Sequence, residues 1–266
     1  RGLHTDAHFG PYGNRRGHFM SEQIEGRNAV LEAFRSGKCV DKLFILDGCQ
    51  DGPVRTIARE ARKTDTIINY VSKERLDQLS ETRAHQGVIA QVAAYEYSTV
   101  DEILARAEEK GEAPFLILLD NVEDPHNLGA IIRTANLAGA HGVIIPKRRA
   151  VGLTSTVAKT SAGAINYTPV AKVTNIVRTI EELKEKGIWF VCADMGGEIM
   201  YDLDLTGPMG LVIGNEGEGV SRLVREACDF TASIPMKGDI DSLNASVAAG
   251  VLAYEIVRQR LVKSSK

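Results

Sequence analysis

Phe115-Leu-Ile-Leu-Leu-Asp-Asn-Val-Glu-Asp-Pro-His-Asn-Leu-Gly-Ala-Ile-Ile-Arg-Thr134 passes from a fully apolar run through a polar loop into an amphipathic segment. The apolar run predicts a strand at 115–119, and the spacing after the loop predicts a helix at 128–138. Ligands of open α/β sheets gather where strands end and helices begin, so this junction is a candidate binding site. Asn127 stands at a plausible N-cap and Arg133 inside the helix, although capping and solvation alone could explain both.

The same alternation continues on the carboxyl side of this stretch. It predicts further strands and helices, the strands at 142–145, 189–193, 210–213 and 230–234 and the helices at 175–186, 220–227 and 245–260. Short apolar strands that alternate with helices favour a parallel sheet with helices on both faces. Residues 114–266 are therefore expected to form one α/β domain.

A smaller alternating region precedes it. We expect helices at 28–35, 54–63 and 73–79 and strands at 43–46, 67–71 and 88–94, which together make a small α/β domain over 20–97. The charged and weakly apolar residues 98–113 are expected to form a linker. Residues 1–19 combine Gly, His, Arg and Asn with little apolar periodicity, and a disordered tail or a leader is expected there.

The composition is that of a globular protein, with 44% hydrophobic and 25% charged residues among 266. No apolar run approaches the ~18 residues that a spanning helix needs, so the simplest interpretation is a soluble cytoplasmic protein without membrane contact. The four cysteines are scattered and form no C-x-x-C pair. Neither a zinc site nor a disulfide framework is indicated, and no metal is expected.

Charge is unevenly distributed along the chain, although the formal net charge is only −3. Residues 125–180 contain no Asp or Glu, and they carry seven positive side chains: Arg133, Lys147, Arg148, Arg149, Lys159, Lys172 and Arg178. This segment could present a basic face to a phosphate backbone. Acidic neighbours in the fold could equally balance it, and the sequence does not decide between the two.

A second motif, Leu211-Val-Ile-Gly-Asn-Glu-Gly-Glu-Gly-Val220, is a strand followed by a glycine-rich turn. Its glycines permit close backbone approach or positive φ. The spacing fits neither the dinucleotide fingerprint nor the P-loop, which disfavours nicotinamide and nucleoside-triphosphate binding. The Glu216 carboxylate suits a ribose hydroxyl, an amine or a positive charge better than a phosphate.

A third motif, Ile234-Pro-Met-Lys-Gly-Asp-Ile-Asp-Ser-Leu-Asn-Ala-Ser-Val-Ala-Ala-Gly250, joins a strand end to a helix start. Ser242 and Asn244 are competent helix caps, and the small residues from Ala245 to Gly250 permit close helix packing. No serine has the partners of a hydrolytic triad, so nucleophilic catalysis is not supported.

In this order and at these separations, the three motifs resemble those of the SpoU/TrmH family of RNA ribose methyltransferases, in the SPOUT superfamily. The preceding region, with Glu25-Gly-Arg-Asn-Ala-Val30 and His85-Gln-Gly-Val-Ile-Ala90, resembles that family's substrate-binding domain. The resemblance implies an α/β fold with a C-terminal trefoil knot, preceded by a small α/β domain like ribosomal protein L30e. It also implies a homodimer that binds RNA and not DNA.

Carried over to this chain, the resemblance implies S-adenosylmethionine as cofactor, contacted at Gly214, Ile234 and Leu243. It implies a reaction site built from Arg133, Asn127, Glu216, Ser242 and Asn244. The reaction would be 2′-O-methylation, and the subfamily most similar to the chain methylates a guanosine of 23S ribosomal RNA.

Other functions stay open at this point. They are methylation of another ribosomal or transfer RNA site, including one that confers antibiotic resistance, ribosomal RNA binding without catalysis, and a nicotinamide-dependent oxidoreductase. Arginine stays protonated under ordinary conditions, so Arg133 is expected to position a phosphate and stabilise developing alkoxide charge. The destination of the proton is left open.

Overall fold

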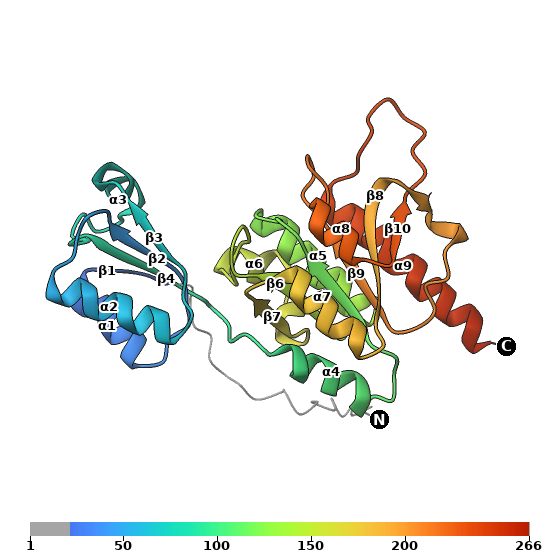
Figure 1. Cartoon of the computed structure of the whole chain (residues 1–266), viewed down its shortest axis with the longest axis horizontal. Helices are drawn as coiled ribbons and strands as arrows, with labels where there is room; N and C mark the ends of the chain where they lie inside the picture. Colours follow the sequence, from blue (N-terminus) through green and yellow to red (C-terminus); the bar gives the residue numbers. More distant parts are fainter. Residues whose placement is uncertain (1–21, 266) are drawn as a thin grey trace, which may run out of the picture.

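A computed structural model describes residues 22–265, which form two α/β units joined by helix α4 (Val100–Glu109) (Figure 1). The tail expected at residues 1–19 lies outside the described residues. Within the described part, no helix combines the length and the apolar character needed to cross a bilayer.

The N-terminal unit has a four-stranded mixed sheet in the order β1-β4-β2-β3. Only the β2–β3 pair is parallel. Its elements are β1 (Glu22–Glu25), α1 (Arg27–Arg35), β2 (Val40–Leu46), α2 (Gly52–Lys63), β3 (Ile68–Val71), α3 (Lys73–Leu79) and β4 (Val88–Val92). All the predicted elements of this unit are present. Strand β1 was not predicted, because four residues with one apolar side chain give no periodic signal.

The C-terminal unit has a six-stranded sheet in the order β10-β8-β9-β5-β6-β7, and every pair is parallel. The elements are β5 (Phe115–Leu119), α5 (Pro125–Leu137), β6 (Gly142–Pro146), α6 (Ser155–Thr160), η1 (Ala164–Asn166), β7 (Val170–Val173), α7 (Ile176–Glu185), β8 (Trp189–Ile199), η2 (Met200–Asp202), β9 (Met209–Ile213), α8 (Arg222–Ala227), β10 (Phe230–Ser233) and α9 (Ala245–Ser264). The predicted α/β class with a parallel sheet is confirmed. The trefoil knot stays a prediction.

Strand β5 explains why helices cover both faces of this sheet. All five of its residues are buried, with alternate side chains on opposite faces. Phe115, Ile117 and Leu119 pack in a core with residues of α5 and α9. Leu116 and Leu118 pack in another core with residues of α4, α7 and α8. A strand without a polar face requires cover on both sides.

Strand β7 and helix α6 were not predicted. Strand β7 is short and lies at the sheet edge, where Lys172 interrupts its apolar pattern. Helix α6 has only six residues, fewer than two turns, so no periodicity can develop. Thr154 caps it by accepting a hydrogen bond from Val157 N at 3.2 Å.

Polar contacts join the two units around Asp41 of β2. Asp41 Oδ1 accepts hydrogen bonds from Tyr97 Oη at 2.8 Å and from Lys172 Nζ at 2.7 Å. The Lys172 ammonium also lies 4.4 Å from the centre of the Tyr97 ring. Burial, with added effects from Asp41, raises the pKa of Tyr97 well above its usual value. Tyr97 therefore stays a neutral hydrogen-bond donor.

These contacts settle part of the charge question that the sequence left open. Lys147 pairs with Asp65, Lys172 with Asp41 and Arg178 with Glu182. The other four cations of the segment have no hydrogen bond or ion pair to side chains within residues 22–265; they are Arg133, Arg148, Arg149 and Lys159. Acidic neighbours therefore balance three of the charges, and a contact of the other four with phosphate stays a prediction.

We predict that Asp41→Ala lowers the free energy of unfolding by about 1 to 3 kcal/mol, because it leaves Lys172 and the Tyr97 hydroxyl without their partner. The side chains of Asp41 and Lys172 are only 10% and 17% exposed. Asp65→Ala is the matched control, since its side chain is 72% exposed and its loss should cost less than about 1 kcal/mol. Urea unfolding measures both variants, and equal losses would contradict the prediction.

Candidate active site

Three polar loops follow β5, β9 and β10 at the same edge of the six-stranded sheet. They are residues 120–124, 214–221 and 234–244. Because the strands are parallel, their carboxyl ends meet at one edge, where ligands of open α/β sheets bind. In Figure 1 the chain between β10 and α9 projects as a long loop from this edge.

The first and second loops are tied together beneath the site. Asp120, a buried carboxylate at the end of β5, accepts a hydrogen bond from Ser221 N at 2.7 Å. Asn215 Nδ2 donates to Asn121 O at 3.2 Å. These contacts fix the glycine-rich turn over the end of β5. Neither Asp120 nor Asn215 is among the residues that the sequence pattern predicts for this site, and the only signal is that Asp120 directly follows a buried strand.

The glycines of the second loop serve the turn itself. Asn215 and Gly219 exchange two main-chain hydrogen bonds of 3.2 and 2.8 Å, and Gly219 has a φ of 68°. A Cβ on Gly214 would lie 2.2 Å from the carbonyl carbon of Gly219, so a side chain cannot fit. The close approach that the glycine pattern predicts is therefore present, but it occurs within the loop.

The second and third loops meet at Asn244. Its Nδ2 donates to Asn127 Oδ1 at 3.1 Å and also to Glu216 Oε1. The same Glu216 oxygen accepts from Ala245 N at 3.2 Å. Asn244 also caps α9, since its Oδ1 accepts from Ser246 N at 2.9 Å. One residue of each predicted motif thus takes part in a single hydrogen-bonded cluster.

The predicted N-cap role of Asn127 is wrong. Helix α5 begins two residues earlier, at Pro125, and Asp124 caps it by accepting a hydrogen bond from His126 N at 2.8 Å. Proline is favoured in the first helical turn, where no intrahelical donor is needed. Asn127 therefore lies inside the first turn, and its side chain is available to Asn244.

Arg133 and Ser242 stand outside this cluster. Arg133 lies further along α5, and its exposed side chain makes no hydrogen bond or ion pair with any residue of 22–265. Ser242 is exposed in the third loop and, over the same residues, likewise has no hydrogen-bond partner, so its predicted capping role is wrong. The cap is Asn244, because only its amide is placed to accept from both Ser246 N and Val247 N.

The third loop has the groups needed to hold a nucleoside. Ile234 and Leu243 are half-buried at its two ends. Among the described residues, no main-chain hydrogen bond engages the backbone of residues 234–243, so its donors and acceptors are open to a ligand. The loop carries Lys237, Asp239 and Asp241, so its formal charge is −1, and the Glu216 carboxylate bonded to Asn244 adds a second negative charge near its end. The residues present therefore fit a polar ligand with a positive charge.

The fold and this edge define a two-domain α/β protein with a nucleoside-type site on a parallel sheet. Two family models match the chain: "SpoU rRNA Methylase family" over residues 114–254, and "RNA 2'-O ribose methyltransferase substrate binding" over residues 23–98. The chain belongs to the SpoU/TrmH family of RNA methyltransferases.

Relatives and solved structures agree with this assignment. The chain is 52% identical over 245 residues to the putative TrmH family tRNA/rRNA methyltransferase YacO of Bacillus subtilis, covering 91% of this chain and 98% of that protein. A Staphylococcus saprophyticus relative with the same family description is 47% identical, covering 89% and 95%. The crystal structure of the SpoU methyltransferase AviRb from Streptomyces viridochromogenes matches with a TM-score of 0.59 and 30% identity, covering 95% of each chain. The complex of AviRb with AdoMet matches with a TM-score of 0.58 and 28% identity, covering 94% and 96%.

Variants of Asn244 should separate capping from the polar cluster. Asn244→Ala removes both roles and should lower the free energy of unfolding by about 1 kcal/mol. Asn244→Ser keeps a capping oxygen but cannot reach Asn127 and Glu216 together, so it should stay within about 0.5 kcal/mol of the parent. Chemical denaturation gives both values. A serine variant as unstable as the alanine variant would show that the cluster, and not the cap, stabilises the start of α9.

Proposed function

We propose that this protein transfers a methyl group from S-adenosylmethionine to a ribose 2′-oxygen of RNA, and that the target is a guanosine of 23S ribosomal RNA. The observation that carries the proposal is the cluster of Asn127, Glu216 and Asn244, which brings the three motifs together on the helix that carries Arg133. The family membership excludes the nicotinamide-dependent alternative.

The proposed cofactor site lies in the second and third loops. Gly214, Ile234 and Leu243 would contact the cofactor, largely through main-chain groups that the loop leaves open. The AviRb complex with AdoMet, and an AdoMet-bound rRNA methyltransferase from Sinorhizobium meliloti at 25% identity and a TM-score of 0.56, support this cofactor. S-adenosylmethionine supplies an electrophilic methyl group on a positively charged sulfur.

Arg133 is the proposed contact for the reacting nucleotide. Its guanidinium has no partner in the described chain, so its charge is available to RNA. A planar guanidinium binds phosphate through two parallel hydrogen bonds and stays protonated. In this position it would hold the phosphate and stabilise negative charge that develops on the 2′-oxygen.

The remaining residues would act by orientation. Asn127, Ser242 and Asn244 would position the ribose and the loops, with the Ser242 hydroxyl free for a substrate contact. Glu216 would hold the third loop against the second through Asn244 and Ala245 N. Alignment of two reacting centres is itself a large part of such catalysis.

The N-terminal unit is proposed to supply RNA specificity, in agreement with the substrate-binding model that matches residues 23–98. We propose residues 20–97 as this domain, 98–113 as the linker and 114–266 as the methyltransferase domain. Such a protein would act in the cytoplasm, where its RNA substrates are.

The test is to map 2′-O-methyl groups in ribosomal and transfer RNA from cells with and without the protein. Loss of a single methylated guanosine of 23S ribosomal RNA on deletion is expected, together with its restoration by purified protein and radiolabelled cofactor. Loss at a transfer RNA site would redirect the target, as the tRNA/rRNA description of the relatives allows. Absence of any methyl transfer would favour RNA binding without catalysis.

Arg133→Lys should lose most of the transfer rate, on the order of 10²-fold or more, because a point charge cannot replace the planar fork. Cofactor affinity should survive, because the proposed cofactor contacts lie on other loops. Calorimetry with S-adenosylmethionine and single-turnover transfer measure the two effects in one preparation. Arg148→Lys, another exposed arginine of the same segment without a partner in residues 22–265, is the control. Near-normal transfer by Arg133→Lys would remove Arg133 from the chemistry.

We also propose a homodimer through α9. Its support comes from exposed apolar side chains of this helix and not from the small residues at its start. The small residues at the start of α9 pack within the chain, where Ala245 and Ala249 are buried and Gly250 faces Thr134 of α5. The exposed apolar side chains Val247, Tyr254 and Leu261 recur every seven residues along the same helix. That spacing places the three side chains on one face of α9, about 10 Å apart along its axis, which supports a helix-mediated contact between subunits.

Light scattering at micromolar concentration should give about twice the chain mass of 28.9 kDa. Tyr254→Glu should shift the protein toward the monomer, because it places a charge in the middle of the apolar stripe. Leu223→Glu on α8 changes another exposed apolar side chain and is the control that should leave the mass unchanged. A monomeric parent protein would count against the dimer.

A further inference from the structure

A cavity lies in the N-terminal unit between α2 and the edge strand β3, far in sequence from the three methyltransferase motifs. It has a volume of about 450 Å³. Its walls come from the loop after β2, from α2 and from β3, and its lining side chains include Asp47, Val54, Arg55, Ala58, Arg62 and Tyr70. This volume is within the range of pockets that hold ligands of nucleotide size.

Tyr70 gives the cavity a flat aromatic wall. It lies on β3, at the edge of the sheet, and is 52% exposed. Within residues 22–265, no other ring stacks on it and no cation lies over its face. A half-exposed ring with an open face can stack with a nucleobase, whichever base it is.

Two arginines face the same cavity from α2. The side chains of Arg55 and Arg62 are exposed, and neither guanidinium has a hydrogen bond or ion pair to another described residue. They are seven residues apart, which separates them by about 10 Å along the helix. Ala58 lies between them and leaves space for a sugar. The arrangement suits two phosphates that flank a nucleotide.

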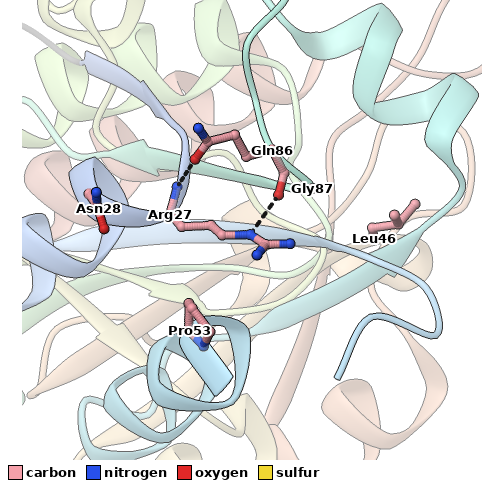
Figure 2. Close-up of a pocket in the computed structure, with 6 residues that line it drawn as sticks. All are labelled: Arg27, Asn28, Leu46, Pro53, Gln86 and Gly87. Carbon is pink, nitrogen blue, oxygen red and sulfur yellow. Dashed lines mark hydrogen bonds between the residues drawn. The ribbon is translucent and has the colours of Figure 1, made fainter. Parts of the chain in front are cut away.

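Another pocket of the N-terminal unit, of about 540 Å³ and lined by Arg27, Leu46, Pro53 and Gln86 among others, lacks such free charge (Figure 2). There the Arg27 Nε donates to Gln86 O at 3.1 Å, and the guanidinium forms an ion pair with Asp51 at 2.5 Å. Arg27 N also donates to Gln86 Oε1 at 3.1 Å. Because these contacts hold and neutralise it, Arg27 stabilises the loops rather than offering its charge to a ligand.

One carboxylate, Asp47, also lines the cavity of Tyr70. A carboxylate repels phosphate, so phosphates would lie toward α2 and the base toward Asp47. The oxygens of Asp47 can accept hydrogen bonds from amino groups of a base. The three kinds of side chain therefore match the base and the phosphates of one nucleotide.

We propose that the cavity between α2 and β3 binds an unpaired nucleotide of the RNA substrate, with the base stacked on Tyr70 and the flanking phosphates bound by Arg55 and Arg62. This site rests on the proposed function, because it assumes that RNA is the substrate. It would hold the RNA at a distance from the reacting ribose and so contribute to affinity and not to chemistry.

The test uses the full chain and a short single-stranded oligoribonucleotide of mixed sequence with a fluorescent label. Tyr70→Ala should weaken binding about 5- to 100-fold, whereas Tyr70→Phe keeps the ring and should stay within about twofold. Arg55→Ala and Arg62→Ala should each lower the slope of log Kd against the logarithm of the salt concentration by about 0.7, the value for one lost phosphate contact with a single strand. Arg59→Ala, on the same helix but outside the cavity lining, is the charge-matched control and should have a smaller effect.

Affinity for S-adenosylmethionine and thermal unfolding should be unchanged in all these variants, which distinguishes a lost RNA contact from a lost fold. In methyl transfer to 23S ribosomal RNA, Tyr70→Ala should raise KM and leave kcat near the parent value.

If the parent protein transfers methyl groups to RNA and Tyr70→Ala binds RNA normally, the nucleotide site is overturned and the proposed function stands. If Arg59→Ala weakens binding as much as Arg55→Ala and Arg62→Ala, the cavity is not a site. Failure of the parent to bind or methylate RNA would overturn both proposals.

Discussion

Burial of the six-stranded sheet on both faces is the constraint on which the rest of the C-terminal unit depends. Strand β5 has no polar face, so each side must be covered, and an α-helix lies between consecutive strands everywhere except between β8 and β9, where the connection holds only the short η2. These crossovers make every pair of strands parallel. All the strand ends with polar loops therefore lie at one edge, and the candidate site is a consequence of how the core is buried.

The site itself depends on a small number of loop contacts. Asp120 and Asn215 fix the glycine-rich turn, and Asn244 then joins that turn to α5 and to the start of α9. Such a cluster holds polar side chains in place before any ligand binds, which favours catalysis by positioning. Arg133 and Ser242 remain outside it, with their polar groups directed to no described partner. The site thus combines polar side chains that are held in place with others that are free to contact a ligand.

The positive side chains fall into two groups, those paired across the two units and those left unpaired in each unit. Lys147 and Lys172 join the units through Asp65 and Asp41, so they serve the fold. Arg133 in one unit, and Arg55 and Arg62 in the other, are exposed and have no partner among the described residues. An RNA that contacts both units would meet these unpaired charges, while the paired ones keep the units together. The net charge of −3 does not reveal this arrangement, because it sums paired and unpaired charges alike.

The sequence by itself determined the α/β class, the parallel sheet and the family. Apolar runs and helical spacing are local properties, and the three motifs are contiguous strings such as Leu211–Val220. Short strands such as β1 and β7 were not predicted, because four residues are too few to show a periodic pattern of apolar side chains. Only the tertiary structure decided which cations are paired, that Asp124 and not Asn127 caps α5, and that Asn244 reaches Asn127 across 117 positions of sequence. The pairing of Lys147 and Lys172 and the contact of Asn244 with Asn127 depend on distances between residues far apart in the chain, which spacing along the chain does not contain. The cap of α5 is a local contact, but two neighbouring residues could each cap a helix, and only the structure shows where the helix begins.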